Sequence, residues 1–123
     1  MILIAYGTRP EIIKLFPLAR ELERQSISFK TLFTGQHLDL YQDVKELMPQ
    51  PDYQLNDICK FSNSLAKSYS IICGAVEKII SKRDFKCIII QGDTTTACAI
   101  SKIAFYNQIK IAHVEAGLRT YDP

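Results

Sequence analysis

The sequence predicts one α/β domain built on a parallel sheet with helices on both faces. Short apolar runs that end at glycine or polar residues are typical of buried parallel strands, and they alternate with segments whose apolar residues recur at helical spacing. The chain has 123 residues, of which 47% are apolar, and this is enough for one domain with a buried core. Strands that alternate with helices form βαβ units, whose strands run parallel.

Four strands are expected, over residues 2–6, 29–34, 87–91 and 109–114. Each is a short, mainly apolar segment of the length that strands in globular proteins usually have. The third is the clearest, because consecutive isoleucines fill it and Gly92 closes it. The segment 56–63, which is polar, is expected to be a loop.

Four helices are expected alongside these strands. Their ranges are 9–25, 38–48, 64–82 and 94–106. The first helix has the clearest start, because Thr8 and Glu11 fit a capping box and Pro10 is tolerated in the first turn. Its apolar residues recur at helical spacing and predict one buried face. These residues are Ile12, Leu15, Phe16, Ala19 and Leu22.

Composition excludes several classes of function. The net charge of +2 gives no reason to expect a nucleic-acid partner, and the apolar runs are too short to span a membrane. The four cysteines include no C-x-x-C pair, which argues against a metal site and favours reduced thiols in a cytoplasmic protein. The first glycine turn lacks the G-x-G-x-x-G fingerprint of nicotinamide-dependent dehydrogenases.

Polar clusters follow each of the four expected strands. They are Gly7–Glu11, Thr34–His37, Gly92–Thr96 and Glu115–Thr120. In open parallel sheets, ligands bind beyond the carboxyl ends of the strands. Because these ends share one edge of the sheet, we expect the four clusters to converge on one site.

Two cations stand at the start of the first helix, Arg9 and Lys14. They are either solvated side chains of the first turns or ligands of an anion. A positive charge near a helix N-terminus is unfavourable for the macrodipole, which favours the second interpretation. Gly7 allows a close approach to the backbone, and the free N–H groups of the helix end suit a phosphate.

Two carboxylates, Asp93 and Glu115, follow later strands. Asp93 is either an N-cap or an active-site group, and Glu115 is either a solvated strand-end residue or an active-site group. The hydroxyls of residues 94–96 suit anion binding. His113 lies on the same side of its strand as Glu115, and it and His37 also fit ordinary structural or surface roles. Two cations with two carboxylates suit acid/base chemistry on a phosphorylated substrate.

The four clusters, read in order, resemble the non-hydrolysing UDP-N-acetylglucosamine 2-epimerases. The strings that carry the resemblance are GTRPE at 7–11, TGQH at 34–37, GDTTT at 92–96 and HVEAGLRT at 113–120. The resemblance implies a Rossmann-like parallel sheet within a glycosyltransferase-B-like, two-domain fold. Residues 1–123 would then form the N-terminal domain, without the C-terminal nucleotide-binding domain, and would be inactive alone.

The resemblance also implies the reaction. Such enzymes interconvert UDP-GlcNAc and UDP-ManNAc by eliminating UDP to give 2-acetamidoglucal and then adding it back, with no nicotinamide or metal. Asp93 and Glu115 match the acidic active-site positions, and Arg9 and Lys14 match positions that contact the substrate. The motifs leave open which carboxylate is the base on which face.

Further expectations concern ligands and assembly. Gln36 and His37 match a segment that holds a second, activating UDP-GlcNAc in some members, although residues 38–41 depart from the usual continuation. A UDP-sugar is the expected partner, and a homodimer is expected for the full-length protein, with a bacterial origin and a role in cell-surface polysaccharide biosynthesis. The alternatives are a 2-epimerase of another UDP-amino sugar, a non-catalytic nucleotide-sugar-binding module, and half of a glycosyltransferase.

Overall fold

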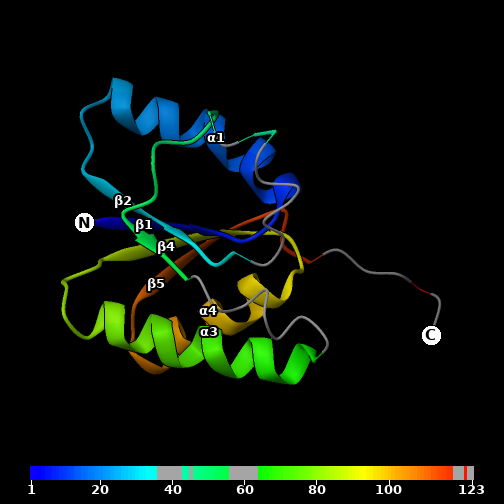
Figure 1. Ribbon diagram of the computed structural model, residues 1–123. Helices are drawn as coiled ribbons and strands as arrows, with labels where there is room; N and C mark the ends of the chain where they lie inside the picture. Colours follow the sequence, from blue (N-terminus) through cyan, green and yellow to red (C-terminus); the bar gives the residue numbers. More distant parts are fainter. Residues whose placement is uncertain (36–42, 45, 56–63, 118–120, 122–123) are drawn as a thin grey trace.

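The computed structural model describes residues 1–35, 43–44, 46–55, 64–117 and 121. It contains strands and helices in the alternating order that the sequence predicts (Figure 1). In chain order these elements are β1 (Ile2–Tyr6), α1 (Arg9–Arg24), β2 (Phe29–Phe33), β3 (Tyr53–Gln54), α3 (Leu65–Ile80), β4 (Cys87–Gln91), α4 (Thr95–Tyr106) and β5 (Lys110–Val114). Most of the helix expected over 38–48 and all of the loop expected over 56–63 lie outside the described residues. The residues described within 38–48 lie in turns and a bend.

The sheet has the strand order β3-β2-β1-β4-β5, and every neighbouring pair is parallel. The chain builds outward from β1 through β2 to β3, then crosses to the other side of β1 to form β4 and β5. The strand order therefore reverses between β1 and β4. In doubly wound sheets, this reversal opens the crevice in which ligands bind, outside the carboxyl ends of the two strands.

Helices cover both faces of the sheet, as the sequence predicts. Figure 1 shows α1 on one face and α3 with α4 on the other. The alternation of side chains along β1 explains both layers, because Ile4 and Tyr6 pack with α1 while Leu3 and Ala5 belong to the core beneath α3 and α4. All four side chains are fully buried, so β1 is the centre of the molecule.

The two-residue strand β3 was not predicted from the sequence. It is too short for a periodic pattern, and its position depends on a contact from another part of the chain. The Asp52 carboxylate accepts a hydrogen bond from the Thr31 N–H at 2.9 Å and pairs with Lys30 at 2.6 Å. These contacts place residues 53–54 beside the carboxyl end of β2.

The described cysteines, Cys73, Cys87 and Cys98, are free thiols. Burial raises the pKa of the Cys73 thiol, although Tyr69 acts in the other direction through a hydrogen bond. A protonated, partly buried thiol behaves as a small apolar side chain. The described helices include none with the length and apolar character that a membrane crossing requires.

Candidate active site

The candidate site lies at the carboxyl edge of the sheet, around the ends of β4 and β5, and the turn after β1 is next to the turn after β4. The turn after β1 contains Gly7 and Thr8, and the turn after β4 contains Gly92 and Asp93. Gly92 has a φ of 71°, in the left-handed region that glycine adopts without strain. The chain therefore turns sharply out of β4 and presents Asp93 before α4 begins.

A buried carboxylate joins these two turns. Glu11, which is only 1% exposed, accepts hydrogen bonds through Oε2 from the N–H groups of Gly7 at 2.9 Å and Thr8 at 2.7 Å. Its other oxygen, Oε1, accepts a hydrogen bond from Thr94 Oγ1 at 2.7 Å. The predicted capping box is thus present, with the Thr8 side chain at the Glu11 backbone N–H and the Glu11 side chain at the Thr8 backbone N–H.

The N-cap of α4 is Thr94, not Asp93. Thr94 has extended backbone angles, and its Oγ1 accepts a hydrogen bond from the Ala97 N–H at 3.1 Å. The interpretation of Asp93 as a helix cap is therefore wrong. The neighbouring Thr96 is fully buried, and its hydroxyl lies 2.8 Å from that of Thr34. The hydroxyls of Thr94 and Thr96 are thus used inside the protein and are not presented to an anion.

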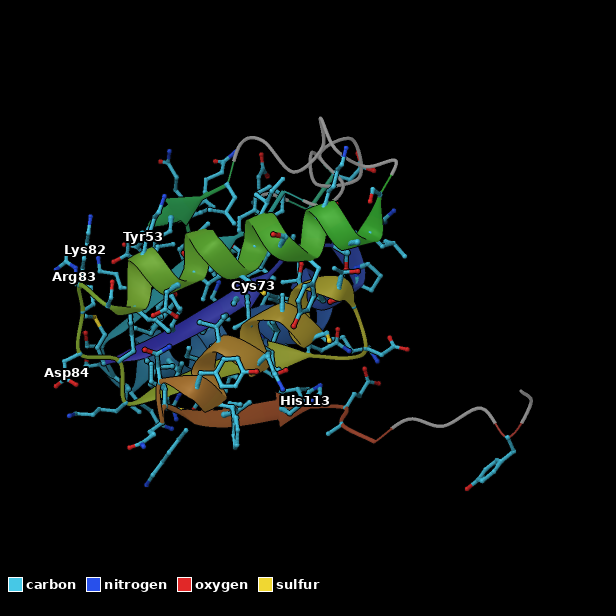
Figure 2. All side chains as sticks on the ribbon, turned by 90° about the horizontal axis from the view of Figure 1, so that it is seen from below. Tyr53, Cys73, Lys82, Arg83, Asp84 and His113 are labelled. Carbon is cyan, nitrogen blue, oxygen red and sulfur yellow. The ribbon has the colours of Figure 1, made fainter. Side chains whose placement is uncertain are left out.

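Asp93 and Glu115 line one hollow of about 270 Å³ between the start of α4 and the end of β5. Asp93 is exposed, and its carboxylate makes no hydrogen bond or ion pair with any described residue. His113 lines the same hollow and lies near the carboxyl end of β5 (Figure 2). Its Nε2 donates a hydrogen bond to the Gly92 carbonyl at 2.6 Å, which supports the structural interpretation of this histidine.

Glu115 is held from two sides. The Lys14 ammonium donates a hydrogen bond to Oε1 and forms an ion pair, and Gln91 Nε2 donates a hydrogen bond to Oε2. Glu115 has a φ of 56°, in the left-handed region that costs a non-glycine residue roughly 1–2 kcal/mol. Backbone strain of this kind is typical of functional positions, and here it occurs at a residue whose carboxylate accepts two hydrogen bonds and lines a hollow.

The Lys14 hydrogen bond lowers the pKa of Glu115 below its ordinary value. Partial burial acts in the opposite direction, and the Lys14 charge and the Gln91 hydrogen bond add to the lowering. The carboxylate is therefore ionised at neutral pH. Lys14 and Glu115 are both partly exposed, with side-chain accessibilities of 46% and 38%, so solvent screens their attraction.

Replacing Lys14 with Met is expected to raise the pKa of Glu115 towards 4.5, because the main cause of its lowering is lost. In the wild type, the Lys14–Glu115 ion pair stabilises the fold fully above pH 4.5, the ordinary pKa of Glu115. This contribution disappears as the pH falls through the lowered pKa of the folded protein. Carbon-13 NMR titration of the Glu115 carboxyl measures the shift. Lys30→Met removes the same charge from the ion pair with Asp52 and is the matched control. An unchanged pKa in Lys14→Met would show that the ion pair does not persist in solution.

Arg9 lies apart from the two carboxylates of the hollow. Its guanidinium is exposed and stands 4.0 Å from the Asp43 carboxylate. Arg9 and Lys14 are not among the described residues that line the hollow. Of the expected site residues, Lys14 forms an ion pair with Glu115, and Glu115 and Asp93 line the same hollow. Gln36 and His37 lie outside the described residues.

Sequence reasoning missed two residues of this site, Glu11 and Gln91. Glu11 was placed in the first polar cluster and interpreted as a capping residue, with no contact to another strand end, and its bond to Thr94 spans 83 positions along the chain. Gln91 is the one polar residue in an otherwise apolar strand, which was the available signal for a functional contact at the strand end. In the described part of the chain, no group of His, Cys, Asp and Glu side chains forms a metal site.

The sequence of this chain is similar to known epimerases. A family model for UDP-N-acetylglucosamine 2-epimerase matches residues 20–123. A UDP-N-acetylglucosamine 2-epimerase from Campylobacter jejuni is 42% identical over 125 residues, which cover 98% of this chain and 32% of that protein. The enzyme of the same name from Neisseria meningitidis serogroup A is 40% identical, with 98% and 33% covered. The chain spans about a third of the length of the curated relatives it matches.

The fold of this chain is also similar to solved structures of UDP-GlcNAc 2-epimerases. The Neisseria meningitidis UDP-GlcNAc 2-epimerase bound to UDP-GlcNAc superposes with a TM-score of 0.86 at 37% identity, covering 98% of this chain and 33% of that one. The Methanocaldococcus jannaschii enzyme in complex with UDP-GlcNAc and UDP gives a TM-score of 0.86 at 35% identity, with 98% and 34% covered. These neighbours have a glycosyltransferase-B-like fold, and this chain corresponds to about a third of it.

Proposed function

Because this chain belongs to the UDP-N-acetylglucosamine 2-epimerase family, we propose that it is the N-terminal domain of an enzyme that interconverts UDP-GlcNAc and UDP-ManNAc. In the proposed reaction, a base takes the proton from C2 and the bond between C1 and the UDP oxygen breaks, which gives 2-acetamidoglucal and UDP. UDP then adds back to C1, and a proton returns to C2 on the other face. The inverted centre is C2.

The pair of carboxylates in one hollow is the observation that carries this proposal. Removal of a weakly acidic C2 proton needs a positioned base, and its return on the other face needs an acid. Asp93, which has no described partner, is available for either role, and Glu115 lines the same hollow. Which of the two is the base on which face stays open.

Lys14 and Arg9 are the proposed cations for the leaving diphosphate. Positive charge near the breaking bond stabilises the negative charge that builds on UDP. The Lys14 ammonium now binds Glu115. A diphosphate that attracted this ammonium would remove the main cause that lowers the pKa of Glu115, and the carboxylate would become a better base once substrate is bound.

The proposed partner is a UDP-sugar, and a homodimer in the cytoplasm stays a prediction for the full-length protein. The relatives of known structure were solved with UDP-GlcNAc, or with UDP-GlcNAc and UDP, which supports a UDP-sugar ligand. The second, activating UDP-GlcNAc at Gln36 and His37 also stays a prediction.

The decisive experiment follows proton exchange at C2 in deuterated water. We expect the full-length protein to incorporate deuterium at C2 of UDP-GlcNAc and to form UDP-ManNAc, as measured by NMR and mass spectrometry. The 123-residue chain alone is expected to show no exchange, because its hollow is only part of the proposed cleft. A full-length protein that binds UDP-GlcNAc without exchange would be a binding module, and a panel of UDP-amino sugars identifies a different substrate.

A further inference from the structure

Glu11 is a buried charge that the proposed chemistry does not use. Its side chain is 1% exposed, so it has no access to a substrate, and no described Lys, Arg or His forms an ion pair with it. Burying a carboxylate without a cation is unfavourable unless hydrogen bonds compensate for the lost water. Glu11 has three such bonds, and its place in the first turn of α1 adds the favourable sign of the helix dipole.

The partners of Glu11 come from two different turns of the site. Oε2 binds the N–H groups of Gly7 and Thr8, immediately before Arg9. Oε1 binds the hydroxyl of Thr94, immediately after Asp93. One rigid carboxylate therefore links the turn after β1 to the turn after β4 across the strand reversal.

The Thr94 hydroxyl has only one orientation in this arrangement. Its oxygen accepts the Ala97 N–H at the start of α4, and its single proton goes to Glu11. All three hydrogen bonds run towards the Glu11 oxygens, from the Gly7 and Thr8 N–H groups and from the Thr94 hydroxyl. The helix cap of α4 and the turn after β1 are thereby held as one unit.

We propose that Glu11 is a positioning residue that sets the place of Asp93 relative to the cations of α1, through Thr94. This inference rests on the proposed epimerase function. Ordinary helix capping needs only the bonds to Gly7 and Thr8, and it explains neither the complete burial of the charge nor the bond to Thr94. A displacement of about 1 Å at a reacting group costs on the order of 100-fold in rate.

The test compares Thr94→Val with Ser64→Ala in the full-length enzyme. Ser64 caps α3 through a hydrogen bond from the Lys67 N–H, away from the hollow, so its loss removes a helix cap without touching the link to Glu11. We expect Thr94→Val and Glu11→Gln each to lower kcat by about 10-fold to 100-fold with little change in KM. Ser64→Ala is expected to keep the wild-type kcat, and Thr94→Ser, which restores the hydroxyl, to recover most of it.

Two further measurements separate positioning from stability. The double variant Glu11→Gln with Thr94→Val is expected to be no slower than the slower single variant, because both break one link. Additive losses, or equal kcat values for Thr94→Val and Ser64→Ala, would overturn the proposal. If the wild-type protein shows no epimerase activity, hydrogen exchange of the Gly7 and Thr8 amides still decides the inference. Thr94→Val is expected to speed this exchange and Ser64→Ala is not, and equal rates in the two variants would overturn the link.

Discussion

Glu115→Gln is expected to lower the rate of C2 proton exchange in the full-length enzyme by about 100-fold to 10,000-fold, the range that general acid–base catalysis contributes. The amide has the shape of the carboxylate, and its oxygen still accepts a hydrogen bond from Lys14 or Gln91. It cannot take up a proton. It also leaves the Lys14 ammonium without its charged partner, so this cation is freer to bind the diphosphate and KM is expected to change less than kcat.

The matched control for this variant is Glu77→Gln. Glu77 is an exposed carboxylate on α3 that accepts a hydrogen bond from the Asn107 side-chain amide at 2.9 Å, much as Glu115 accepts one from Gln91. It lies outside the hollow, so the rate of exchange in Glu77→Gln is expected to equal that of the wild type. Mass spectrometry of the recovered UDP-sugar measures the deuterium at C2. Turnover of Glu115→Gln near the wild-type rate would remove Glu115 from the mechanism.

The main features of the fold were predictable because they depend on local patterns. The strands β1 and β4 are nearly unbroken apolar runs that end at glycine or polar turns, and their buried positions leave little choice of structure. The start of α1 follows from its capping residues, and the extent of α1 and α4 follows from their apolar spacing. The strand β3 was not predictable, because a side chain of Asp52 and the edge of β2 place it, and neither contact is local in sequence.

The candidate site was predictable only in outline. Parallel strand ends share one edge, so a meeting of Lys14 with Glu115 across 101 positions is consistent with the topology. The choice of helix cap was not predictable, since Asp93 and Thr94 are both good capping residues and stand next to each other. In the structure Thr94 is the cap, and its hydroxyl also donates a hydrogen bond to Glu11. That bond joins two residues that are far apart in sequence, so no local pattern could predict it. The ion pair of Arg9 with Asp43 was not predictable either. Asp43 belongs to the segment 38–48, which was expected to be a helix, and its described residues lie in turns and a bend.

Asp93 is not the cap of α4, so its carboxylate is available for chemistry in the hollow. Asp93→Asn is expected to lower C2 exchange by about 100-fold to 10,000-fold, because the residue is exposed in the hollow and the amide cannot act as a base or an acid. Stability is expected to stay within about 0.5 kcal/mol of the wild type, as for substitutions away from structural contacts. Exchange at the wild-type rate in this variant would exclude Asp93 from the chemistry.

Alanine variants of neighbouring residues separate this functional role from capping. Thr94→Ala removes the hydrogen bond from the Ala97 N–H and the one to the buried Glu11 carboxylate. It is expected to cost about 2–4 kcal/mol in the free energy of unfolding, because the usual loss for an N-cap is joined by that of a buried acceptor left without its partner. Asp93→Ala removes no bond to a described residue and is expected to leave that free energy nearly unchanged while it abolishes exchange. Urea unfolding of both variants measures the difference. A loss of about 1 kcal/mol in Asp93→Ala would return Asp93 to the role of helix cap, and its carboxylate would then no longer be free for proton transfer.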